Sequence, residues 1–154
     1  MDKKEQIKIA ENLQKYELGL SHLYNGFAKA FPEHKEFWTK LSVEEDTHAF
    51  MLRSFKEMVE NGDLELPPRR FSLEAIDNNL RKLSSLQDLF LRSGISLKEA
   101  LEWALEIESG ILEHQTFLSV EGDPPEMKRV LDVISADTRR HSQELKNLYK
   151  GLYK

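Results

Sequence analysis

The residues of this chain that could act together in chemistry are glutamates and histidines at recurring spacings. Glu45 and His48 lie three residues apart, so on a helix both side chains project from one face. A carboxylate oxygen and an imidazole nitrogen can then reach the same metal ion, and this ligand mixture suits iron, manganese or zinc. A single Glu-x-x-His is a weak signal, because a buried hydrogen-bonded pair has the same spacing.

An internal repeat strengthens the signal. Glu17 and Glu108 are 91 residues apart (108 − 17), and each begins a Glu-x-Gly motif that an aliphatic residue follows. His48 and His141 are 93 residues apart (141 − 48). Three apolar pairs share this second offset: Trp38 and Leu131, Leu41 and Ile134, and Leu52 and Leu145. Two similar segments therefore each supply a carboxylate and a histidine in register.

Five ionisable residues interrupt the apolar stripes near the middle of their segments: Glu17, Glu45, His48, Glu108 and His141. A carboxylate in a helical core is costly unless it is paired, protonated or bound to a metal. Five such groups at one level of the core favour the metal. We therefore predict that these five residues hold one ion well, or two ions less tightly.

The elements that must position these residues are helices. Apolar residues recur every three to four positions, which predicts amphipathic helices, and Gly and Pro fall between the segments. The expected helices span about residues 3–30, 33–60 and 72–92, and two more begin at Ser96 and near Pro125. Ser96 and Glu99 form a capping box at the first of these two starts. The apolar stripe of the helix that begins there extends to Leu118.

Short turns pair the first two and the last two long helices, and one long connection separates the pairs. We predict an all-α fold in a single domain over residues 1–154, a four-helix bundle with ferritin-like connectivity. Its expected parts are a hairpin (3–60), a crossover that contains the shorter helix (61–95) and a second hairpin (96–150). Gly19 and Gly110 occupy equivalent positions, which predicts close helix approach at both.

Composition narrows the function classes. The chain has 154 residues and a formal net charge of -5, so it has no basic excess to neutralise nucleic-acid phosphates. It has 0 Cys, which excludes disulfides, thiol catalysis and cysteine-ligated clusters. It has neither the roughly 20-residue apolar run of a membrane span nor the apolar start of a secretory signal. We expect a cytoplasmic protein that binds neither nucleic acid nor membrane.

With these motifs the chain resembles the rubrerythrin-like branch of the ferritin-like di-iron carboxylate superfamily. The run from Glu17 to Tyr24 is similar to that family's first ligand helix, Glu45-Asp-Thr-His48 to its first Glu-x-x-His, and residues 97–108 to its third helix. The resemblance implies non-haem iron, in one or two ions, with peroxide- or oxygen-linked oxidoreductase chemistry or iron handling. It also implies an external electron donor and, by analogy, a homodimer.

The chain also departs from the family pattern. Thr138 stands where the family has a second bridging Glu, and Asp137 is rotated from that position by about 100° on a helix. Ile111 stands where the family often has a further Glu, and Gln115 stands at the position equivalent to Tyr24 in the repeat. The chain has no Cys, so it lacks the rubredoxin-like electron-transfer module. These departures favour an alternative, a degenerate bundle without catalysis that serves as a structural or protein-interaction module. The residues leave open whether the chain is an enzyme.

Overall fold

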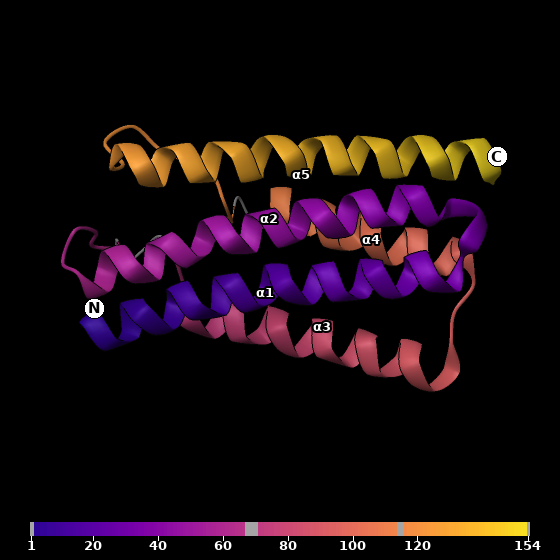
Figure 1. Cartoon of the computed structure of the whole chain (residues 1–154), viewed down its shortest axis with the longest axis horizontal. Coiled ribbons are helices and arrows are strands. Elements are labelled where there is room, and N and C mark those ends of the chain that lie inside the picture. Colours follow the sequence, from indigo (N-terminus) through magenta and orange to yellow (C-terminus); the bar gives the residue numbers. More distant parts are fainter. Residues whose placement is uncertain (1, 67–70, 114–115, 154) are drawn as a thin grey trace. The chain divides into compact units, whose positions relative to one another are not determined.

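The computed structural model describes residues 2–66, 71–113 and 116–153, and these residues are mostly helical (Figure 1). The elements in chain order are α1 (Lys3–Ala30), the short 3-10 helix η1 (Pro32–His34), α2 (Lys35–Glu60), α3 (Leu73–Ser93), α4 (Leu97–Glu113) and α5 (Pro125–Leu152). The described residues contain no strand, so the all-α class is confirmed for them. Residues 67–70 of the expected crossover, and Gln115, lie outside the described residues.

The helix boundaries follow the sequence signals closely. Pro125 is the first residue of α5, as predicted, whereas α2 begins two residues later than expected because Pro32–His34 form the 3-10 turn η1. The capping box before α4 is also confirmed. Glu99 N donates to Ser96 Oγ at 3.1 Å, and Ser96 N donates to Glu99 Oε1 at 3.2 Å. These two bonds satisfy N–H groups that have no acceptor within the helix.

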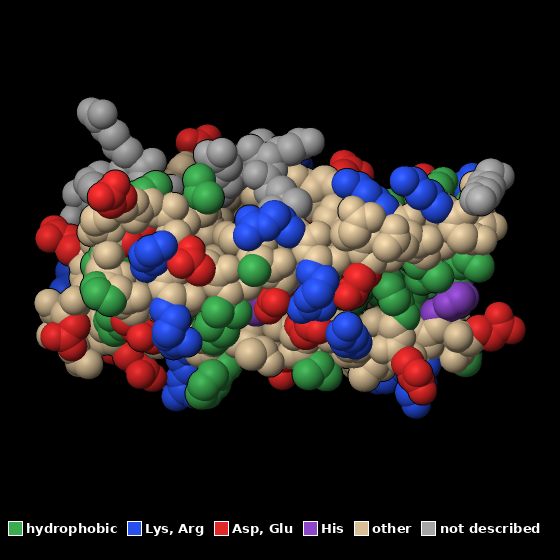
Figure 2. All heavy atoms as spheres, turned by 90° about the horizontal axis from the view of Figure 1, so that it is seen from above, with side chains coloured by type: hydrophobic (Ala, Val, Ile, Leu, Met, Phe, Trp, Pro, Cys, Tyr) green, Lys and Arg blue, Asp and Glu red, His purple; other side chains and the backbone are tan. Residues whose placement is uncertain are grey.

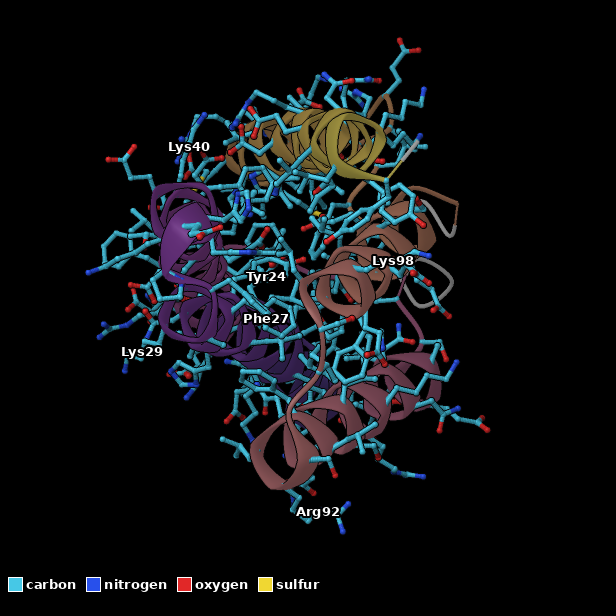
Figure 3. All side chains as sticks on the ribbon, turned by 90° about the vertical axis from the view of Figure 1, so that its right-hand side faces the viewer. Tyr24, Phe27, Lys29, Lys40, Arg92 and Lys98 are labelled. Atoms are coloured by element: carbon cyan, nitrogen blue, oxygen red, sulfur yellow. The ribbon has the colours of Figure 1, made fainter. Side chains whose placement is uncertain are left out.

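The chain divides into two compact units, Met1–Ser93 and Gly94–Lys154. In the first unit α1 and α2 form an antiparallel hairpin (Figure 1), and aromatic side chains of the two helices form a cluster. The rings of Phe27 and Trp38 meet edge to face at 4.9 Å, and the Tyr24 ring lies 5.7 Å from that of Trp38. All three side chains are fully buried. Figure 3 shows Tyr24 and Phe27 on the inward side of α1 and Lys29 pointing away from it.

The third helix of this unit, α3, packs along α1 in the same direction. Asn12 Nδ2 donates to Asp77 Oδ1 at 2.7 Å, and Gln87 Nε2 donates to the Gly19 carbonyl at 2.8 Å. The residue numbers rise together on the two helices, so the helices are parallel. The predicted close approach at Gly19 is confirmed, because a Cβ added there would lie 2.6 Å from Leu83 Cδ2.

In the second unit α4 and α5 form an antiparallel hairpin of their own. Among its described residues, the fully buried apolar side chains are Ala100, Leu101, Ala104, Met127, Val130, Leu131, Ile134 and Leu145. Two predictions for this unit are wrong. A Cβ on Gly110 would meet no atom of the described residues within 4 Å, so the close approach expected there is not found among them. Leu118 is 42% exposed because α4 ends at Glu113 and the stripe does not continue past that end.

The surface carries charges of both signs in ion pairs along helices. On α5 the pairs include Lys128 with Asp132 at 3.1 Å and Arg129 with Glu126 at 2.6 Å. The face in Figure 2 likewise shows Lys and Arg interspersed with Asp and Glu. Among the described helices, none combines the length and the apolar character that crossing a membrane demands.

Candidate metal centre

In the first unit, Glu17, Glu45 and His48 lie together in the core. Each offers one ligand atom, and these three atoms all lie within 4.8 Å of one another. The side chains are 1%, 2% and 1% exposed, respectively. Two ligands on opposite sides of one ion at typical metal–ligand lengths lie about 4.2 Å apart. The three atoms are therefore close enough to share an ion after small rotamer changes.

The α1–α2 hairpin brings the three residues together. Glu17 lies on the inner face of α1 between Leu13 and Leu20, which are both buried. Glu45 and His48 follow each other by one turn on the inner face of α2, as the i, i+3 spacing requires. His48 Nδ1 lies 3.3 Å from Glu45 Oε2, so the imidazole and the carboxylate point into the same space.

The composition of the core determines what can balance the charge of these carboxylates. Among the described residues that are buried, the charged or polar side chains include three glutamates and two histidines but no Lys or Arg. Removing a carboxylate from water costs several kcal/mol unless a proton, a cation or strong donors compensate it. A divalent cation bound where Glu17 and Glu45 converge would supply this compensation.

The second unit contains the matching pair from the sequence repeat. His141 Nδ1 on α5 lies 3.5 Å from Glu108 Oε1 on α4, and both side chains are fully buried. The hairpin therefore places a carboxylate of one helix against an imidazole of the next. This pair has the same two ligand types as the cluster in the first unit, with one carboxylate fewer.

The inner face of α5 carries Thr138 one turn before His141, and the neighbouring Asp137 points elsewhere. Thr138 is 2% exposed, and its hydroxyl donates to the carbonyl of Ile134 in its own helix at 2.8 Å. Asp137 instead accepts from Arg140 Nη2 at 3.0 Å on a partly exposed side of α5. The expected rotation of Asp137 away from the inner face is confirmed, so Asp137 does not supply a carboxylate there in place of Thr138.

All five residues singled out in the sequence are buried. The structure brings Glu17, Glu45 and His48 together in one unit, and Glu108 and His141 together in the other. Their service as metal ligands stays a prediction. Sequence reasoning missed the other buried polar residues, among them Ser21 and Ser42, although each of these two lies on the same helical face as a candidate carboxylate.

Comparison with known proteins identified no relative of this chain. In three searches, no family model, no curated protein and no solved structure significantly matches the chain.

Proposed function

We propose that this chain is a non-haem iron-binding protein with a ferritin-like, rubrerythrin-type site, in which Glu17, Glu45 and His48 bind the metal. The observation that carries the proposal is the convergence of two carboxylates and one imidazole, almost fully buried, with one ligand atom each within 4.8 Å of the others. Manganese and zinc accept the same donor set, so the experiment compares them with iron.

The donor set fits such an ion in charge as well as in type. Two carboxylates offset a divalent charge, and a neutral imidazole adds a strong nitrogen donor. A bound iron ion would supply redox chemistry toward oxygen or peroxide, with electrons from an external donor. The chain's own contribution is to hold the ligands together, to keep bulk water from them by burial, and to orient the His48 ring beside Glu45.

The proposal includes the second hairpin on the basis of the sequence repeat. We propose that the two hairpins form one four-helix bundle and that Glu108 and His141 complete the ligand set. This step predicts that Glu108→Gln changes the properties of the same metal site that Glu17 and Glu45 bind. Separate, independent effects of Glu108→Gln and Glu45→Gln on two sites would contradict it.

A second candidate function is a bundle without catalysis that serves as a structural or interaction module. The observation that favours it is Thr138, which uses its hydroxyl within its own helix and supplies no carboxylate. In this case the contact of 3.3 Å between His48 Nδ1 and Glu45 Oε2 is part of a buried polar group that supports the fold.

Metal titration of the full chain distinguishes the two functions. The chain is freed of metal with a chelator, and Fe²⁺ (without air), Mn²⁺ and Zn²⁺ are titrated while bound metal is measured. We expect saturable binding by the wild-type chain. Glu45→Gln should lose about 100-fold or more in affinity, because removing a ligand costs at least as much as removing a residue that orients one. The matched control is Asp46→Asn, because Asp46 is the exposed neighbour of Glu45 on α2.

Two results would overturn the iron proposal. One is the absence of saturable binding of any of the three ions by the wild-type chain. The other is equal binding by wild type, Glu45→Gln and Asp46→Asn, since the metal would then lie elsewhere. Either result favours the structural module.

A further inference from the structure

Ser21 on α1 and Ser42 on α2 exchange hydrogen bonds across the hairpin. Ser21 Oγ donates to the Ser42 carbonyl at 2.9 Å, and Ser42 Oγ donates to the Ser21 carbonyl at 2.8 Å. The two hydroxyl oxygens lie 3.1 Å apart, and the side chains are 6% and 8% exposed. Each hydroxyl reaches the main chain of the opposite helix, so the two backbones approach closely at this point.

This pair lies one helical turn from the candidate metal ligands. Ser21 follows Glu17 by four residues, and Ser42 precedes Glu45 by three. Residues three or four apart share a face of a helix, about 5 Å along its axis. The serine pair and the carboxylate pair are thus successive contacts along the same antiparallel interface.

Apolar packing and hydrogen bonds between α1 and α2 constrain the two helices differently. Apolar burial, as in the Tyr24–Trp38–Phe27 cluster, is non-directional and tolerates small sliding of one helix along the other. Hydrogen bonds are directional and weaken steeply when their geometry changes. A metal site requires ligand distances within about 0.2 Å of their ideal values. Directional contacts next to the ligands therefore limit sliding where the metal site tolerates it least.

We propose that Ser21 and Ser42 are positioning residues of the metal site. Their reciprocal bonds fix the spacing and register of α1 and α2 so that Glu17 and Glu45 converge on one ion. This inference rests on the proposed function, because positioning has meaning only if these carboxylates bind a metal. A purely structural role of the pair would stabilise the hairpin without changing the metal's ligand geometry.

Co²⁺ is the probe, because its visible absorption reports ligand number and geometry as well as affinity. The test compares Ser21→Ala and Ser42→Ala with the control Ser54→Ala in the full, metal-free chain. Ser54 is a suitable control because its hydroxyl donates within α2, to the Met51 carbonyl at 2.6 Å. Far-ultraviolet circular dichroism verifies that each variant keeps its helices, and the main-chain carbonyls of both serines remain helical acceptors.

We expect Ser21→Ala and Ser42→Ala each to weaken Co²⁺ binding by about tenfold, the scale seen for residues that orient metal ligands. Both also shift the Co²⁺ absorption bands, and Ser54→Ala does neither. The double variant should weaken binding by less than the product of the single effects, since both changes break the same reciprocal pair. Should one single variant fail to fold, the other alone decides.

The outcomes separate this inference from the proposed function. Wild-type chain that binds no Co²⁺, Fe²⁺, Mn²⁺ or Zn²⁺ overturns the metal site and the positioning role with it. Wild-type chain that binds Co²⁺, with unchanged affinity and absorption bands in both serine variants, overturns only the positioning role. A loss of stability in those variants without a change in the bands also overturns it, because the pair would then be structural.

Discussion

Gly26 on α1 lies directly against the ring of Phe90 on α3, and a Cβ added at Gly26 would be 2.8 Å from Phe90 Cε2. The same relationship occurs two turns earlier, where Leu83 lies against Gly19. The two glycines and the two apolar side chains each repeat at seven residues. The Phe90 ring also meets Phe27 edge to face at 5.1 Å. Helix α3 therefore packs closely on α1 at two positions, one at each glycine.

This fit predicts that Gly26→Ala destabilises the first unit even though alanine favours helices. The propensity gain is about 1 kcal/mol at most, whereas forcing a methyl group into a filled contact costs about 1–3 kcal/mol. Gly110→Ala is the matched control, because it meets nothing within 4 Å among the described residues, and it should stabilise by roughly 0.5–1 kcal/mol. Urea denaturation followed by circular dichroism measures both, and equal gains in the two variants would contradict the fit.

The docking of α3 could not be predicted from the sequence. Periodicity is a local property, and it predicts α1, α2 and α3 because each apolar stripe lies within one helix. The pairing of Gly26 with Phe90 joins residues 64 positions apart (90 − 26). The sequence around a glycine does not show which distant side chain will pack against it. The same limit explains the wrong prediction at Gly110, which has the same sequence motif as Gly19, although a Cβ there would meet no atom of the described residues within 4 Å.

The candidate ligands were easier to predict than their neighbours. Glu17 and Glu45 interrupt apolar stripes, and a charged residue at a core position stands out from its surroundings. Ser42 is small and neutral, so its position on the inner face of α2 gives no signal without its partner Ser21. Leu118 shows the opposite error, since an apolar stripe can continue in the sequence after the helix has ended at Glu113.

The capping box before α4 predicts that Ser96→Ala destabilises the second unit by about 1 kcal/mol. The variant removes the acceptor of Glu99 N and leaves that N–H without its partner. Ser85→Ala is the control, because Ser85 is also exposed but donates within its own helix, to Arg81 O at 3.0 Å. Equal shifts of the urea midpoint in the two variants would mean that the box contributes nothing.

Introducing a carboxylate at position 138 should increase metal binding. Thr138→Glu creates a Glu-x-x-His on α5, in addition to the one on α2. The new Glu would share a helical face with His141, which contacts Glu108. The metal-free variant should lose about 1–3 kcal/mol of stability, because a buried carboxylate replaces a satisfied hydroxyl. Metal content should rise by about one ion per chain, as expected for a di-metal ligand set.

Thr138→Gln is the matched control for this gain, because its side chain has the same size without the charge. It should lose less stability than Thr138→Glu, because an amide is cheaper to bury than a carboxylate, and it should gain no metal. The measurements are metal analysis after dialysis and thermal unfolding with and without Fe²⁺. Metal content that does not rise in Thr138→Glu would show that the second unit does not contribute to the site.

Glu17→Gln should change the free energy of unfolding in opposite directions with and without bound metal. In chelator, Glu17→Gln should equal or exceed the wild type, because an amide is cheaper to bury than a carboxylate. With metal at about 100 times its dissociation constant, the wild type gains about 2.7 kcal/mol from binding, and the variant loses most of this gain. Glu11→Gln on the partly exposed side of α1 should show no such inversion. Thermal unfolding of the three proteins under both conditions measures the effect, and a wild type that is equally stable with and without metal would rule out a metal site at Glu17.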